Sequence, residues 1–235
     1  MSKQQNIDLI REALRSRGIV NETLINGILA VVGKESLFIP QSENLNYSAE
    51  RITQVWPYIK INEARELAGN PMKLAERVYS KKYGNIKAGD GYKYRGRGFN
   101  QVTFADNYYS LSKKLGIDLI KNPDLLNDPK IAAAALAEYY KQAFASGAKF
   151  IKDFYKININ ALQPGIDALT LLKIAVNANS GWRKDRAIVD KEYFKALPFF
   201  EKFMILKGSP ITAAKNSLPV LIPLILLFLF LVNKK

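Results

Sequence analysis

The sequence contains neither cysteine nor histidine among its 235 residues. The absence of cysteine excludes a disulfide scaffold and thiolate metal sites. The absence of histidine excludes Ser-His and Cys-His nucleophile pairs, His-ligated zinc and an imidazole general base. An enzyme built from this chain therefore takes its acid–base chemistry near neutral pH mainly from Asp, Glu, Lys or Tyr, and we expect no metal and no other cofactor.

Negative charge is also scarce, because 35 Lys and Arg residues outnumber 21 Asp and Glu residues. The net charge is +14. A field of this sign attracts polyanions such as nucleic acid, anionic lipid or a bacterial wall. The basic residues are scattered, so the charge does not choose among these partners, and a merely solubilising surface stays an alternative. A hydrophobic content of 48% excludes a disordered chain.

Apolar residues recur mainly at helical spacing, and strand-type alternation is almost absent. The N-terminus lacks the uncharged apolar core of a signal peptide, and it predicts a first helix that Asn6 caps and Gly18 ends. Asn21 caps the second predicted helix, over 21–35. Further helices are predicted over 48–56, 62–68, from 71, from 104, and over 130–145, 167–176 and 183–196. The sequence predicts a mainly α-helical fold.

Five glycines between positions 84 and 98 interrupt this helical pattern. They are interleaved with tyrosines and arginines, which is typical of a loop or a short hairpin.

The C-terminal segment 218–232 contains 15 residues without a charge. As a helix it spans about 22 Å, short of the ~30 Å hydrocarbon core, but flanking lysines can extend it by snorkelling. We expect a folded domain over 1–206, a linker over 207–217 and a C-terminal hydrophobic helix over 218–232 that anchors the protein in a lipid membrane. A buried core helix is the alternative for this segment.

Two glutamates are candidates for acid–base chemistry. Glu35 follows Val32 by three residues and Ile28 by seven, which places it on the apolar face of its helix. Burial there would disfavour its charged form and suit a general acid, unless the side chain curls out to solvent. Glu43 lies in a polar segment that we expect to be exposed, where a carboxyl stays ionised. Two carboxyls in opposite environments fit the pair used in glycoside hydrolysis.

Several ordered motifs resemble family 19 glycoside hydrolases, and most of all their phage endolysin branch. They lie at 33–38, 43–51, 77–79, 84–85, 89–103, 122–126 and 185–186, so the resemblance covers roughly residues 20–195. It implies a bilobed, lysozyme-like fold that hydrolyses β-1,4 bonds between N-acetylated sugars.

The resemblance also implies roles for single residues. Glu35 matches the general acid, Glu43 the second acidic position of the endolysin branch, and Thr103 a hydroxyl residue that holds the attacking water. The polar residues that match the lining of the sugar cleft are Gln101, Asn107 and Asn177. The sequence departs from the family pattern in having Lys34 in place of His, Ser36-Leu37 in place of Gly-Gly, and Asn177-Ala178-Asn179 in place of Asn-Gly-Gly.

The residues near the two glutamates suit a glycan. Sugar rings can stack on the aromatic faces that we expect at Tyr47, Tyr92 and Tyr94. Arg95 and Arg97 offer guanidinium groups to the carboxylates of peptidoglycan. A nucleic-acid-binding loop would use the same residue types, but it leaves the segment from Glu35 to Glu43 unexplained, so no specific nucleic acid is expected.

These observations predict a peptidoglycan-degrading glycosidase of phage or bacterial origin that acts on glycan strands. A virus with a lipid membrane would carry such a tethered protein beside other virion proteins. A chitinase and an inactive wall-binding or structural virion protein are the alternatives.

Overall fold

The computed structural model describes residues 1–205, and this part of the chain is mainly helical and contains no named β-strand. The prediction of a mainly α-helical fold is confirmed. The helices are α1 (Lys3–Ser16), α2 (Glu22–Ser36), α3 (Ala49–Val55), α4 (Ile61–Leu67), α5 (Pro71–Tyr79), α6 (Asp90–Lys93), α7 (Ala105–Leu115), η1 (Pro123–Asn127), α8 (Pro129–Phe150), η2 (Ile151–Tyr155), α9 (Ala168–Asn179) and α10 (Arg186–Ile205).

Most helix starts follow from local capping chemistry. Side-chain oxygens of Asn21, Ser48, Asn70 and Asp128 each accept a backbone N–H of the first helical turn, and the predicted cap at Asn21 is confirmed. The predicted cap at Asn6 is wrong.

The helix α1 begins earlier than predicted because Ser2 and Gln5 form a capping box. Asn6 is buried inside the first turns and donates from Nδ2 to the backbone oxygen of Phe38, at 2.8 Å. A long-range partner therefore overrides the local capping preference of this asparagine.

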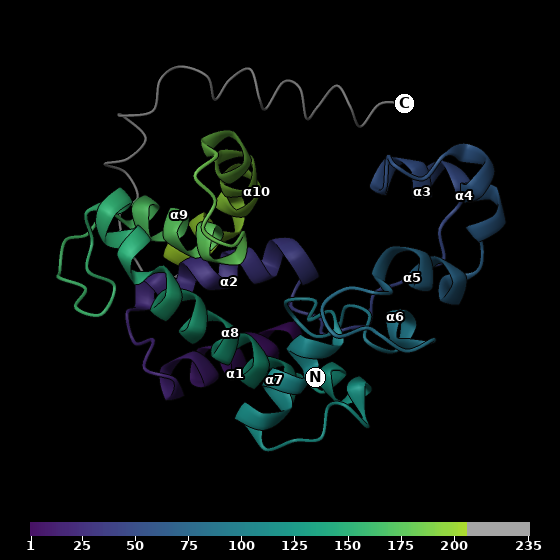
Figure 1. Ribbon diagram of the computed structural model, residues 1–235. Helices are drawn as coiled ribbons and strands as arrows, with labels where there is room; N and C mark the ends of the chain where they lie inside the picture. The colour runs from purple at the N-terminus through teal and green to yellow at the C-terminus, as the bar shows by residue number, and fades with distance from the viewer. Residues whose placement is uncertain (206–235) are drawn as a thin grey trace.

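The larger lobe is built around α2, which lies at its centre in Figure 1 with α9 and α10 on one side and α1 and α8 on the other. Ile25, Ile28 and Leu29 of α2 are fully buried in its apolar core. The close approach of α9 requires a glycine in α2, since a Cβ at Gly27 would lie 3.3 Å from the Cα of Leu172.

A second apolar cluster forms the smaller lobe, which contains α3, α4 and α5 and stands apart from α2 and α10 in Figure 1. Its centre contains Ile52 and Leu74, both fully buried. A third cluster places Tyr108 of α7 and Leu126 of η1 against α8. The separate cores give the described chain two lobes with the glycine-rich segment beside them.

The glycine-rich segment contains the short hairpin that the sequence allows. Arg97 and Val102 form an antiparallel bridge, with N···O distances of 3.1 and 2.9 Å. Gly98 turns the chain with a φ of +78°, a conformation that favours glycine.

The ends of α8 and α10 lie beyond their predicted limits. The helix α10 continues past the predicted end at 196 because Phe200 and Phe203 are buried in the large core. The helix α8 continues past 145, where the indole of Trp182 packs against Gly147 so closely that a Cβ would collide with it. Tertiary burial therefore extends both helices.

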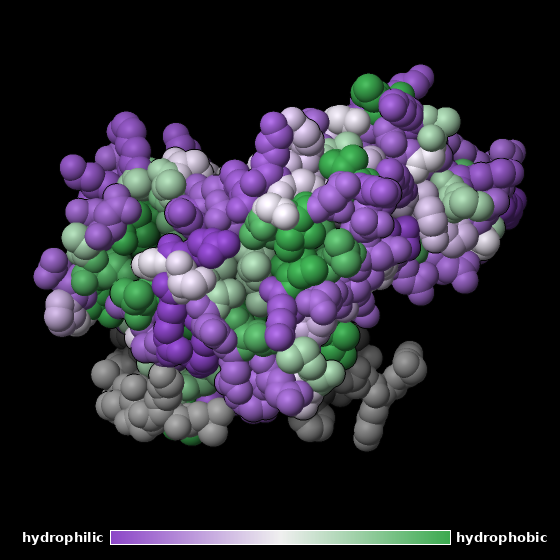
Figure 2. Space-filling view, turned by 90° about the horizontal axis from the view of Figure 1, so that it is seen from below, coloured by the Kyte–Doolittle hydropathy of each residue, from purple (hydrophilic) through white to green (hydrophobic). Residues whose placement is uncertain are grey.

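The outer surface is largely polar. Figure 2 shows one face on which hydrophilic side chains predominate and apolar ones gather in a few patches. No helix within residues 1–205 has the length and apolar character needed to cross a membrane. The predicted linker 207–217 and anchor helix 218–232 lie outside the described residues.

Candidate active site

Glu35 lies on the last turn of α2, with a side chain that is 40% exposed. The predicted burial is wrong, and the alternative of a side chain turned to solvent is what the structure shows. The buried face of this turn contains Gly33 and Ser36 instead, and the Ser36 hydroxyl donates to the backbone oxygen of Val32, at 3.1 Å. The helix therefore presents Glu35 on its open side.

Lys34 joins Glu35 to helix α10. Its ammonium, on a side chain only 10% exposed, lies 2.6 Å from Glu35 Oε1 and 2.5 Å from Glu192 Oε2. Burial opposes the charge, but the hydrogen bonds to Glu192 and Glu35 outweigh it and raise the pKa of Lys34. Burial likewise opposes the Glu192 charge, yet hydrogen bonds from Lys195 and Lys34 lower the pKa of Glu192. Glu35 thus belongs to a carboxylate–ammonium–carboxylate chain.

Glu43 is half-buried and its carboxylate is hydrogen-bonded on both oxygens. The Tyr79 hydroxyl donates to Oε1 at 2.8 Å, and the N–H of Gly96 donates to Oε2 at 3.3 Å. Burial and the neighbouring Glu43 charge raise the pKa of Tyr79, so this phenol stays protonated and remains a donor. The predicted exposed position of Glu43 is wrong because its segment docks on the glycine-rich hairpin.

Gly96 brings Glu43 and Gln101 together. A Cβ at Gly96 would lie 2.7 Å from Gln101 Oε1 and 3.4 Å from the Cβ of Glu43, so a larger residue there would displace the Gln101 amide. Gln101 also donates from Nε2 to the backbone oxygen of Gln41, at 3.0 Å. The acidic segment and the hairpin are therefore held as one hydrogen-bonded unit.

A cavity of about 250 Å³ contains three of the residues singled out in the sequence, which are Gln101, Thr103 and Asn107. The Thr103 hydroxyl donates to the backbone oxygen of Gln101 at 2.9 Å, and Asn107 Nδ2 donates to the backbone oxygen of Thr103 at 2.7 Å. Tyr139 of α8 lines the same cavity. The Thr103 oxygen keeps acceptor capacity, which a hydroxyl needs to position a water.

The other predicted substrate-binding residues are less accessible. Tyr94 is only 5% exposed and packs against Tyr108, with ring centroids 5.3 Å apart, so the expectation of an open ring is wrong. Asn177 is fully buried and donates from Nδ2 to the Tyr155 hydroxyl, at 3.2 Å. Tyr47 is half-buried against Trp56. Binding roles for these residues stay predictions.

Of the two hairpin arginines, Arg97 is not free to bind carboxylates, contrary to the sequence-based expectation. Arg97 is 2% exposed, and its guanidinium donates to Asp124, at 2.7 Å, and to the Tyr108 hydroxyl, at 3.0 Å. The Arg95 guanidinium lies over the Tyr92 ring, 4.1 Å from its centroid. Arg97 therefore stabilises the hairpin from inside the protein. No local sequence signal indicates this role.

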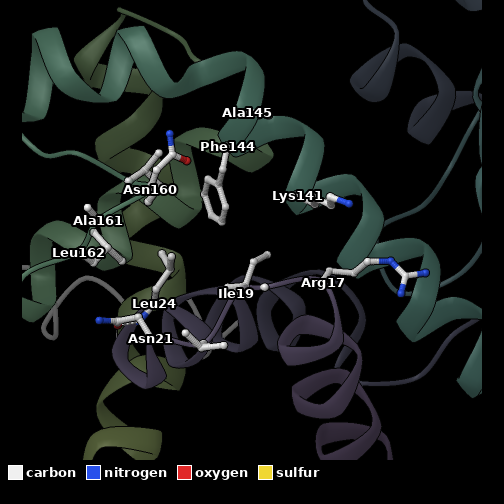
Figure 3. Close-up of a pocket in the computed structure, with 13 residues that line it drawn as sticks. Arg17, Ile19, Asn21, Leu24, Lys141, Phe144, Ala145, Asn160, Ala161 and Leu162 are labelled. Carbon is white, nitrogen blue, oxygen red and sulfur yellow. Dashed lines mark hydrogen bonds between the residues drawn. The ribbon is translucent and has the colours of Figure 1, made fainter.

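A larger cavity of about 660 Å³ lies below α8, where Figure 3 shows Arg17, Lys141 and Phe144 among its lining residues. None of the residues that line it is Asp or Glu, so it supplies no carboxyl for general-acid work. The cavity that contains Thr103 also has no Asp or Glu among its lining residues, so the cavities alone do not choose the site, and Glu35 and Glu43 remain the candidates through the family resemblance. Within residues 1–205, no group of three or more acidic side chains is arranged to hold a metal ion.

The described chain is a helical protein with two glutamates in different surroundings, and comparison with known proteins gives its class. A comparison with protein-family models gives no match. A protein of Haemophilus influenzae described as a glycosyl hydrolase family 19 domain-containing protein is 35% identical over 137 residues, which cover 56% of this chain and 68% of that protein. The chain belongs to glycosyl hydrolase family 19, and this membership supports a glycoside hydrolase kind of activity.

Proposed function

We propose that the protein hydrolyses β-1,4 bonds in the glycan strands of peptidoglycan. In this proposal Glu35 is the general acid, Glu43 the general base, and Thr103 holds the attacking water. The observation that carries the proposal is the hairpin at 96–103, which contacts Glu43 at Gly96 and contributes Gln101 and Thr103 to one cavity. Family membership supports the reaction class but not the particular glycan.

The surroundings of Glu43 suit a base. A carboxylate that accepts from Tyr79 and from a backbone N–H is held in one orientation while its remaining lone pairs stay available. Proton transfer from a water requires hydrogen-bond reach, which a fixed carboxylate provides at little entropic cost.

The surroundings of Glu35 differ from those of Glu43, because Glu35 lies beside the positive charge of Lys34. The Lys34 ammonium lies between the carboxylates of Glu35 and Glu192. Glu192 shares this ammonium and so reduces the charge that Glu35 receives. In this mechanism Glu192 acts as a positioning residue for Lys34, and Glu35 touches the glycosidic oxygen.

We propose inversion at the anomeric carbon. Inverting enzymes separate their carboxyls by ~6.5–9.5 Å to seat a water, whereas retaining enzymes use ~5–5.5 Å for direct attack. A water-holding hydroxyl at Thr103 has a purpose only if water attacks directly. Proton NMR of the first-formed product is expected to show the α-anomer from a β-linked glycan, and initial release of the β-anomer would rule out inversion.

Peptidoglycan is preferred over chitin because the net charge is +14 and because the motifs most resemble those of endolysins. We also propose that segment 218–232 tethers the enzyme to a membrane and that a phage with a lipid membrane carries it. Mass spectrometry of digested peptidoglycan would identify the bond that is cut and separate hydrolysis from an anhydro-sugar product. Faster turnover of chitin oligomers than of peptidoglycan would favour the chitinase alternative.

An inactive wall-binding protein is a second candidate function. The observation that favours it is the Lys34 ammonium, which replaces the family histidine and lies 2.6 Å from Glu35. Purified peptidoglycan that binds the protein and stays uncut over a wide pH range would support this candidate.

A further inference from the structure

A separate cavity of about 300 Å³ lies where η2, α9 and the first turn of α10 meet. Four basic residues line it, which are Lys173, Arg183, Lys184 and Arg186, and Asp190 is the one acidic residue among the lining residues. Four positive charges and one negative charge leave the cavity with a net charge of +3. This cavity is distinct from the one that contains Thr103.

The basic side chains are anchored by contacts that do not neutralise them. Arg183 donates from Nε to the backbone oxygen of Ser180, at 3.1 Å, which leaves its two terminal nitrogens for a ligand. Arg186 lies over the Phe154 ring, 5.5 Å from its centroid. In the described part of the chain, none of the four basic groups lies within 4.0 Å of a carboxylate oxygen. The cations are thus oriented but unpaired.

Asn177 supplies an independent observation. Its fully buried side chain lines the same cavity and donates from Nδ2 to Tyr155 and to the backbone oxygen of Arg183. Its Oδ1 is buried with no hydrogen-bond partner among residues 1–205. Buried acceptors are normally satisfied, so this oxygen is an unusual feature of the cavity wall.

The two cavities border the same end of α9. Tyr139, which lines the cavity of Thr103, donates from its hydroxyl to the backbone oxygen of Ala178, at 3.0 Å. Asn177, the preceding residue, lines the basic cavity. The C-terminal turn of α9 therefore contributes to the surroundings of both cavities.

We propose that the basic cavity binds a carboxylate-bearing peptide, and that it selects peptidoglycan over chitin by taking the acidic peptides attached to its sugars. The inference rests on the proposed function for its biological meaning. A guanidinium fork matches a carboxylate in geometry and charge, and the terminal nitrogens of Arg183 are available for one. Chitin offers neither the carboxylate nor an extended peptide.

The test is a binding measurement that does not depend on hydrolysis. Calorimetry with the full chain would compare an acidic stem peptide, free of sugar, with the same peptide after its carboxylates are amidated. We expect the acidic peptide to bind about tenfold more tightly, with an affinity that falls as salt rises. Equal affinities for the two peptides would overturn the inference.

Variants of the lining residues, together with a matched control, test whether the basic cavity is the binding site. Arg183→Gln with Arg186→Gln is expected to abolish the tenfold preference, and Lys184→Gln alone to reduce it about threefold. The control is Arg51→Gln with Arg65→Gln, two exposed arginines of the smaller lobe, which should keep the preference. An equal loss in the control would mean a diffuse charge effect and would overturn the site.

Competition with inorganic phosphate tests whether the cavity recognises a carboxylate or a phosphate. If phosphate displaces the peptide at equal concentration, the cavity is a phosphate site and the inference is wrong. If the peptide preference is present while Glu35→Gln remains fully active, the binding site stands and the catalytic proposal fails. If Glu35→Gln is inactive and the peptide preference is absent, the catalytic proposal stands and the binding site fails.

Discussion

Glu35 and Glu43 are eight residues apart, yet opposite kinds of contact hold them. Glu35 is open to solvent and touches a buried ammonium that α10 shares. Glu43 is half-buried and accepts hydrogen bonds from a phenol and a backbone amide, both neutral donors. The comparison teaches that burial alone does not describe the two carboxyl environments, because the charge of the neighbours differs as well.

The largest effect is expected from Glu35→Gln, which keeps the shape of the side chain and removes the acid. The rate of wall lysis should fall by about 100-fold or more, the usual size of a general-acid contribution. Turbidity loss of purified walls measures the rate. Glu66→Gln, an exposed change on α4, is the control and should leave lysis unaltered. Lysis at the normal rate in Glu35→Gln would remove Glu35 from the mechanism.

A smaller effect is expected from a change at Thr103, in the hairpin that contacts Glu43. Thr103→Val keeps a similar shape but cannot hold a water, so hydrolysis should slow by about tenfold or more while glycan binding stays largely intact. The kcat and KM values on a soluble glycan separate the two effects. A rise in KM with an unchanged kcat would show that Thr103 binds substrate and does not position water.

The ion pair between Lys34 and Glu192 extends the comparison, because the stability that it contributes depends on pH. The pKa of Glu192 is lowered in the folded protein, so its contribution to stability is present above its ordinary value of 4.5 and is lost as pH falls. The pKa of Lys34 is raised, so its contribution is present below its ordinary value of 10.5 and is lost as pH rises through the folded value.

Glu192→Gln is therefore expected to lower the melting temperature at pH 7 by about 2–4 °C, and the difference should shrink below about pH 4. Circular dichroism melts at several pH values measure it. A difference that is the same at pH 3 and pH 7 would show that Glu192 acts by packing and not by its charge.

The smallest effect is expected when both glutamates are left in place and the tail is removed. A chain that ends after Ser209 should stay folded and active, because every motif lies before that position. The full-length protein should partition into detergent and the shortened one should not. Aggregation of the shortened chain with loss of helical signal would mean that segment 218–232 belongs to the core.

The sequence by itself determined the helical class and most helix starts, and it left the glycine-rich segment as a loop or a short hairpin. Caps such as Asn21 and Asp128 act on N–H groups within three residues, so their effect is readable locally. Gly98 likewise marks its turn without reference to the rest of the chain. The motifs around Glu35, Glu43 and Thr103 also indicated the family to which the comparison assigns the chain.

Only the tertiary structure decided the environments of the candidate site. The Lys34 ammonium beside Glu35 is shared with Glu192, which lies 157 positions after Glu35 and approaches from α10. Glu43 is half-buried because Gly96 of a distant segment accepts its N–H, at 2.8 Å. Arg97 is internal because Asp124 and Tyr108 surround it. Burial and charge pairing depend on which distant elements pack together, and that is the information that local spacing does not contain.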